Sequence, residues 1–91
     1  MGTNYYAVSK NHDISVHLLK ESYPEQRVFH GNPFFRSYES LVFFLEWLNS
    51  TGGKNVYIED EYGNIFTIPF FKEEVLKEKR PNDKWHHGDF V

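Results

Sequence analysis

The side chains that can carry chemistry in this sequence are histidines and clustered carboxylates. There are five histidines: His12, His17, His30, His86 and His87. Together with Asp89, the adjacent pair His86 and His87 offers ligand types that zinc or manganese accepts. Adjacent histidines point in different directions in most backbones, and histidines on strands are usually surface or satisfied core residues. We therefore expect no bound metal and no cofactor.

A group of three carboxylates precedes a turn, at Glu59, Asp60 and Glu61. Carboxylates can act as an acid/base pair or bind magnesium, and residues 59 and 61 share one face of a strand. Acidic side chains at a hairpin tip are usually solvated, and without a pocket that raises a pKa they do no acid-base work. The sequence also has no serine in a strand-turn-helix elbow and no glycine-rich phosphate loop. We therefore predict no catalytic residues and a protein that is not an enzyme.

Aromatic residues are unusually abundant, with nine Phe, six Tyr and two Trp among 91 residues. A domain of this size has few interior places for large rings, and exposed aromatics are frequent anchors of binding surfaces. One interpretation is that all of them are core or incidental. We instead predict an acidic aromatic surface that binds a protein, built from Tyr5, Tyr6, Phe43, Trp47, Asp60, Glu61 and Tyr62.

A helix over residues 37–50 is the element that positions two of these rings. Ser37 can cap its first turn, and four apolar residues follow at i, i+3, i+4 and i+7: Leu41, Phe44, Leu45 and Leu48. That spacing predicts a buried face. Phe43 and Trp47, four residues apart, lie on a neighbouring face. The pair Gly52 and Gly53 then predicts the end of the helix, with one glycine in the left-handed conformation.

Alternating patterns predict strands before and after this helix. Three precede it, at residues 4–10, around Ile14 to Leu18, and at residues 27–30, and two follow, at residues 54–60 and 64–68. The last two form a hairpin in which Gly63 takes the positive-φ position. A second helix, over residues 67–79, is capped by Thr67.

The predicted fold is a single α+β domain over residues 1–91. It has an antiparallel sheet of about four to five strands and two helices in the order β-β-β-α-β-β-α. Residues 82–91 are predicted to be a partly disordered tail, for which Trp85 and Phe90 are the candidate anchors.

Composition narrows the function classes. The net charge is −3 with no basic block, so the electrostatic footprint of a DNA or RNA binder is missing. Cysteine is absent, which rules out disulfides and is typical of a reducing cytoplasm. No apolar run approaches about 18 residues, and no basic-then-apolar leader is present. We expect a soluble cytoplasmic protein that binds neither nucleic acid nor membrane.

The opening run Met1-Gly2-Thr3-Asn4-Tyr5-Tyr6 resembles that of a group of small uncharacterised phage and prophage proteins. The group is also similar around a helix that carries a Trp, here Trp47, and around an Asp-Glu-Tyr-Gly turn, here residues 60–63. Many members have a Cys-x-x-Cys-Gly segment where this chain has Asn11, His12 and Asp13, so no metal role carries over. The resemblance implies a small phage-encoded accessory protein in the cytoplasm of the host cell, and no residue role.

The functional prediction joins this provenance to the aromatic surface. We expect a non-enzymatic phage accessory protein that binds a host protein, for instance as an anti-defence inhibitor or an inhibitor of a transcription component. One alternative is a small-ligand or metal-dependent activity built from the histidines and the acidic hairpin. A concave pocket shared by two or more of six side chains would favour that alternative: His17, His30, His86, His87, Asp60 and Glu61. The other alternative is a structural homo-oligomer.

Overall fold

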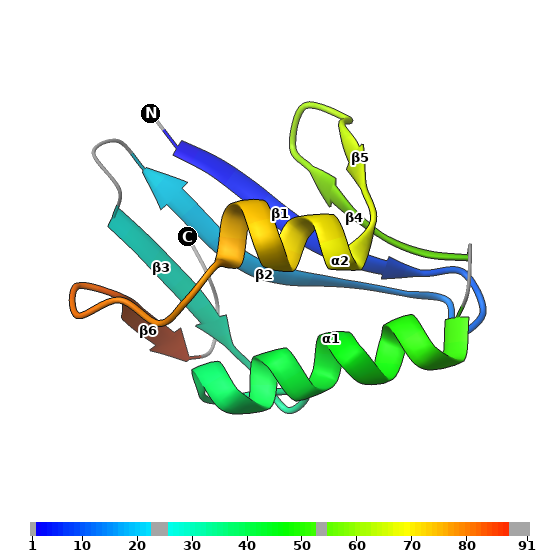
Figure 1. Cartoon of the computed structure of the whole chain (residues 1–91), viewed down its shortest axis with the longest axis horizontal. Helices are drawn as coiled ribbons and strands as arrows, with labels where there is room; N and C mark the ends of the chain where they lie inside the picture. Colours follow the sequence, from blue (N-terminus) through cyan, green and yellow to red (C-terminus); the bar gives the residue numbers. More distant parts are fainter. Residues whose placement is uncertain (1, 23–25, 53–54, 88–91) are drawn as a thin grey trace.

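The computed structural model describes residues 2–22, 26–52 and 55–87. Within these ranges, six strands, two helices and a π-helical turn follow one another (Figure 1). Their bounds are β1 (Gly2–Ser9), β2 (Ile14–Ser22), β3 (Gln26–Gly31), α1 (Tyr38–Gly52), β4 (Val56–Asp60), β5 (Ile65–Phe66), α2 (Ile68–Phe71), η2 (Lys72–Leu76) and β6 (Lys84–His87). The α+β class is therefore confirmed.

The strands form one sheet in the order β5-β4-β1-β2-β3-β6. All neighbours are antiparallel except β3 and β6, which are parallel. The prediction of an all-antiparallel sheet with fewer strands was wrong because part of the expected tail, β6, is a sixth strand. Trp85 holds it there by stacking on Phe29, with ring centroids 4.9 Å apart and planes at 15°. Phe90, the other expected anchor, lies outside the described residues.

The pairing of β1 with β2 contains a bulge. Tyr5 is opposite Leu19 and Tyr6 is opposite His17, so Leu18 has no direct partner. Strict alternation would send one of two consecutive residues to the other face. Because of the bulge, Leu18 and Leu19 are both fully buried.

Helix α1 has the face and the cap that its sequence predicts. The Ser40 N–H donates to the Ser37 hydroxyl at 3.2 Å, and the four predicted core residues are buried: Leu41, Phe44, Leu45 and Leu48. The helix continues to Gly52, where an added Cβ would meet Val56 at the start of β4. Close packing of helix and strand is therefore what requires Gly52. Gly53, the other expected stop, lies outside the described residues.

The second helix is in the predicted place but is shorter. The Phe70 N–H donates to the hydroxyl of Thr67 at 3.2 Å, which confirms the predicted cap. After the single turn of α2 the backbone widens into η2, and Lys77 ends it with φ of 52°. The prediction that the helix reaches residue 79 was wrong because a buried arginine on β3, described below, binds the last carbonyls.

The core lies on one face of the sheet, and both helices cover that face. The ring of Tyr5 on β1 packs against that of Phe71 on α2, with centroids 5.4 Å apart, and the ring of Phe29 on β3 packs against that of Tyr38 on α1, with centroids 6.3 Å apart. Residues of opposite parity, such as Tyr6, lie on the other face of the sheet. No helix among the described residues has the length and apolar character needed to cross a membrane.

Candidate functional site

The outer side of α1 carries exposed aromatic rings. Phe43 is 72% exposed, Trp47 is 43% exposed, and Phe34, in the loop before the helix, is 50% exposed. We call these three residues the aromatic face. Phe44 connects two of them, with its ring 5.2 Å from that of Phe34 and 6.3 Å from that of Trp47. Trp47 also contacts His12 of the β1–β2 turn at 5.2 Å. The aromatic face therefore runs from the start of α1 to the far end of the sheet.

Acidic residues flank this face but are partly neutralised. Glu39 and Glu46 lie one helical turn to either side of Phe43. Glu39 forms an ion pair with Lys79 at 3.4 Å, and Glu46 forms one with Lys72 at 2.9 Å. The surface around Phe43 is therefore less acidic than a count of carboxylates in the sequence indicates.

The predicted acidic aromatic surface does not form one patch. Tyr5 packs on Phe71 and Phe66, at the edge of the core, whereas Tyr6 lies on the opposite sheet face. Tyr62, 64% exposed, lies at the tip of the β4–β5 hairpin, on the side of the molecule away from α1 (Figure 1). Of the seven residues, Phe43 and Trp47 alone share an exposed helix surface.

Asp60 is buried at the hairpin turn, where its carboxylate stabilises the backbone. It is only 7% exposed, and its carboxylate accepts hydrogen bonds from the backbone N–H groups of Tyr62 and Asn64 and from the Asn64 side chain, each at 2.9 Å. Burial raises its pKa, but these hydrogen bonds outweigh burial and hold the pKa below its ordinary value. The turn they stabilise contains Gly63 at φ of 89°, as predicted. Asp60 is therefore not a solvated residue at the tip but one that stabilises the turn, and its role as a binding residue stays a prediction.

Glu61 begins a hydrogen-bonded chain that crosses the face of the sheet opposite to α1 and α2. Its carboxylate accepts from the Asn4 backbone N–H at 2.7 Å and from the Asn4 side-chain NH₂ at 3.0 Å. Because a carboxylate only accepts, the amide oxygen of Asn4 must face the other way, toward His17 Nε2 at 2.8 Å. The proton of a neutral His17 is therefore on Nε2.

This tautomer in turn orients His30. The lone pair of His17 Nδ1 faces His30 Nδ1 at 3.1 Å, so His30 Nδ1–H is the donor between the two rings. Burial, and secondly the neighbouring His30, lower the pKa of His17 to about 4. His17 therefore remains a neutral acceptor at physiological pH. We call the chain of Glu61, Asn4, His17 and His30 the histidine relay.

The relay ends at a concave pocket. The described residues that line the pocket are His30, Gly31, Asn32, Pro33, Arg36 and His87. His30 and His87, two of the six residues that we named for a small-ligand site, both line this pocket, but their side chains leave β3 and β6 on opposite faces of the sheet: His30 lies beside His17, and His87 lies beside Trp85. Within the described ranges, no group of three histidine or acidic side chains is arranged to hold a metal ion.

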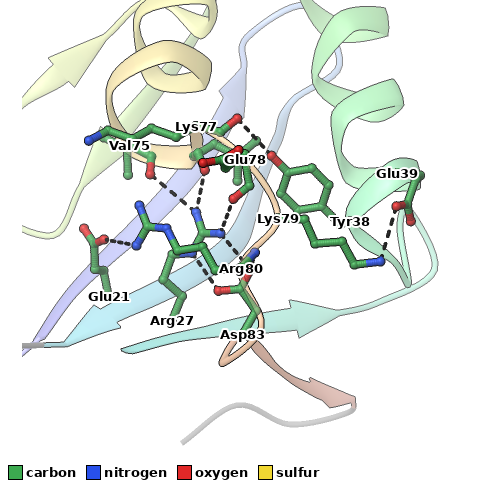
Figure 2. A network of polar contacts seen from close by, with 11 residues as sticks. Glu21, Arg27, Tyr38, Glu39, Val75, Lys77, Glu78, Lys79, Arg80 and Asp83 are labelled. Atoms are coloured by element: carbon green, nitrogen blue, oxygen red, sulfur yellow. Dashed lines mark hydrogen bonds and ion pairs between the residues drawn. The ribbon is translucent and has the colours of Figure 1, made fainter. Parts of the chain in front are cut away.

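Arg27 is the most important polar residue that the sequence reading missed. It is fully buried on β3, and Figure 2 shows its guanidinium group surrounded by acceptors. Nε and Nη2 form two hydrogen bonds with the Asp83 carboxylate at 2.9 and 2.7 Å, and other bonds reach the Leu76 and Glu78 carbonyls at 2.6 and 2.8 Å. Arg27 and Phe29 are two residues apart on β3, so their side chains lie on the same face of the strand. This spacing could have indicated that Arg27 faces the core.

No match was found when the chain was compared with protein-family models, with curated proteins and with solved structures. The functional argument therefore rests on the geometry of the aromatic face and of the sheet.

Proposed function

We propose that this chain is a non-enzymatic binding protein whose aromatic face docks on another protein. The observation that carries the proposal is the exposure of Phe43 and Trp47 on a helix whose opposite side is fully buried. Soluble monomers usually expose large rings singly, and neighbouring exposed aromatics mark contact surfaces. The Trp47 ring is held by contacts with Phe44 and His12, so little side-chain entropy is lost at Trp47 on binding.

The partner that we propose is a host protein in the cytoplasm of a phage-infected cell, such as a component of defence or transcription that the phage protein inhibits. The resemblance of the first six residues to phage proteins supports this provenance. Because Glu39 and Glu46 beside the aromatic face are paired with lysines, the rings carry the proposed contact, and the partner should offer an apolar depression that accepts Phe43 and Trp47.

An affinity capture from host lysate tests this function. The tagged protein should retain a specific host protein, and Phe43→Ala and Trp47→Ala should each abolish capture by removing an anchor worth about 2 kcal/mol or more. Phe70→Ala is the matched control: Phe70 is 49% exposed but lies on α2, away from the aromatic face. The Phe70 variant should capture the partner as the unchanged protein does.

Two outcomes would contradict the proposal. Capture that survives both α1 substitutions would place the contact elsewhere on the molecule. A protein that sediments as a dimer, and as a monomer after Phe43→Ala, would show that the aromatic face binds a second copy of this chain. Thermal unfolding of each variant should accompany these assays, because Phe43 is more exposed than Trp47 and its removal should leave the fold intact.

A further inference from the structure

The face of the sheet opposite to α1 and α2 carries apolar side chains. Both helices and η2 pack their buried residues into one core on the other face, so none of these three elements packs here. We call the face opposite to the helices the outer sheet face. It receives alternate side chains from each strand. Among them are apolar residues that are half-buried or exposed: Tyr6, Val8, Val28, Tyr57 and Ile65.

The charged side chains of the outer sheet face are segregated by sign. Glu59 lies on β4, and the carboxylate of Glu61, just beyond the end of β4, lies on the same face. Lys20 lies on β2 and Lys84 on β6, both on the other half of the sheet. Glu59, Lys20 and Lys84 form no ion pair with another residue of the described ranges. One half of the outer sheet face is therefore acidic and the other half is basic.

This distribution of charge is complementary to itself under one two-fold axis. Two sheets that pack face to face have nearly aligned strands, and two identical chains are usually related by a two-fold axis. An axis across the strands would place each strand over its own copy, so that Glu59 would face Glu59 and Lys84 would face Lys84. An axis along the strands, between β1 and β2 at the middle of the sheet, would place the acidic half of each copy over the basic half of the other.

The second axis brings opposite charges within reach of each other. It places β4 of one copy over β3 of the other, which lies between β2 and β6. Because neighbouring strands are about 4.8 Å apart, Glu59 and Glu61 of one copy are displaced sideways by roughly one strand spacing from Lys20 and from Lys84 of the other. The flexible four-carbon stem of a lysine spans that distance. The apolar side chains of β1 lie next to the axis, so the contact has an apolar centre with charged residues around it.

We propose that the outer sheet face binds a second copy of this chain. In this two-fold dimer Glu59 and Glu61 of each copy pair with Lys20 and Lys84 of the other copy. The complementary charges select the occupant, since one face presents both signs in the arrangement that its own copy needs. The aromatic face lies on the helix side of the sheet and stays exposed in this dimer. The proposal therefore does not depend on the proposed host partner.

Sedimentation velocity of the full chain tests the dimer, at concentrations up to about 0.5 mM, which detect dissociation constants of about 0.1 mM or lower. We expect the chain to change from monomer to dimer as its concentration rises. Glu59→Lys and Lys84→Glu should each weaken the dimer by about tenfold or more, because each places like charges opposite one another. An equimolar mixture of the two variants should dimerise again. In the mixed dimer the introduced lysine of one chain meets the introduced glutamate of the other, and the unchanged Glu59 and Lys84 also meet.

Lys77→Glu is the matched control, because it makes the same change of charge at an exposed residue on the helix side, where Lys77 lines a groove with Val42 of α1. It should leave the dissociation constant within about twofold of the original, since exposed charges outside a contact contribute little. Phe43→Ala should also leave the dimer unchanged.

Four results would overturn the proposal. The first two are a chain that stays monomeric at every concentration and a mixture of the Glu59 and Lys84 variants that stays monomeric. Equal weakening by Lys77→Glu and Lys84→Glu would show a general effect of charge instead of a specific contact. A dimer that Phe43→Ala abolishes would assign the contact to the aromatic face.

Discussion

Replacing Arg27 with Met tests how much this buried arginine stabilises the fold by joining β3 to the C-terminal segment of the described chain. The change removes both hydrogen bonds to Asp83 and the donors to the carbonyls of Leu76 and Glu78. It also leaves the Asp83 carboxylate, whose side chain is 7% exposed, without its counter-ion. Removing one partner of a buried ion pair costs about 3–5 kcal/mol. A chain of this length has roughly 5–14 kcal/mol of stability in total, so the variant should lose a large fraction of it.

Urea unfolding monitored by circular dichroism measures this loss directly. Arg36→Met is the matched control, since the same substitution at an exposed arginine should change stability by less than about 0.5 kcal/mol. The double variant Arg27→Met with Asp83→Leu should recover part of the loss, because it no longer buries an unpaired carboxylate. A loss below about 1 kcal/mol for Arg27→Met would refute the argument, since it would mean that water replaces the guanidinium group at little cost.

Three further predictions concern the core, the hairpin and pH. Leu45→Ala should lower the free energy of unfolding by about 2–5 kcal/mol in the same urea assay, because Leu45 is fully buried; a loss under about 1 kcal/mol would contradict its place in the core. Gly63→Ala should cost roughly 1 kcal/mol, because φ of 89° strains any residue with a Cβ; an unchanged melting temperature would contradict this. The pKa of His17 is lowered from 6.5 to about 4 in the folded state, so between these values the unfolded chain binds more protons and stability should fall as the pH falls. His17→Gln should flatten the stability profile in that window, and an unaltered slope would show that His17 is not the group responsible.

The parts of the fold that depend on local patterns could be predicted from the sequence. The buried face of α1 follows from the spacing of Leu41, Phe44, Leu45 and Leu48, and the conformation of Gly63 follows from the turn. The parts that depend on contacts between distant residues could not. β6 has no apolar alternation, and it is a strand because Trp85 meets Phe29 and because Asp83 meets Arg27.

The candidate sites divide in the same way. The exposure of Phe43 and Trp47 follows from their position beside the buried face of one helix. The chain from Glu61 to His30 joins residues of four segments, and its order depends on strand register, which one sequence does not specify. The pocket likewise requires the parallel pairing of His87 with Gly31, two residues that are far apart in the sequence.

The parallel pairing of β6 with β3 also has a kinetic consequence. α1, β4, β5 and α2 all lie between these two strands in the sequence, so the pairing closes a long loop and should form late in folding. A short edge strand formed late is among the first segments to open in the native state. His87 leaves the pocket each time β6 opens, so any ligand that needs His87 must bind the closed form. Such a ligand would slow hydrogen exchange along β6 in proportion to its occupancy, and the edge of the sheet would act as a reporter of the pocket.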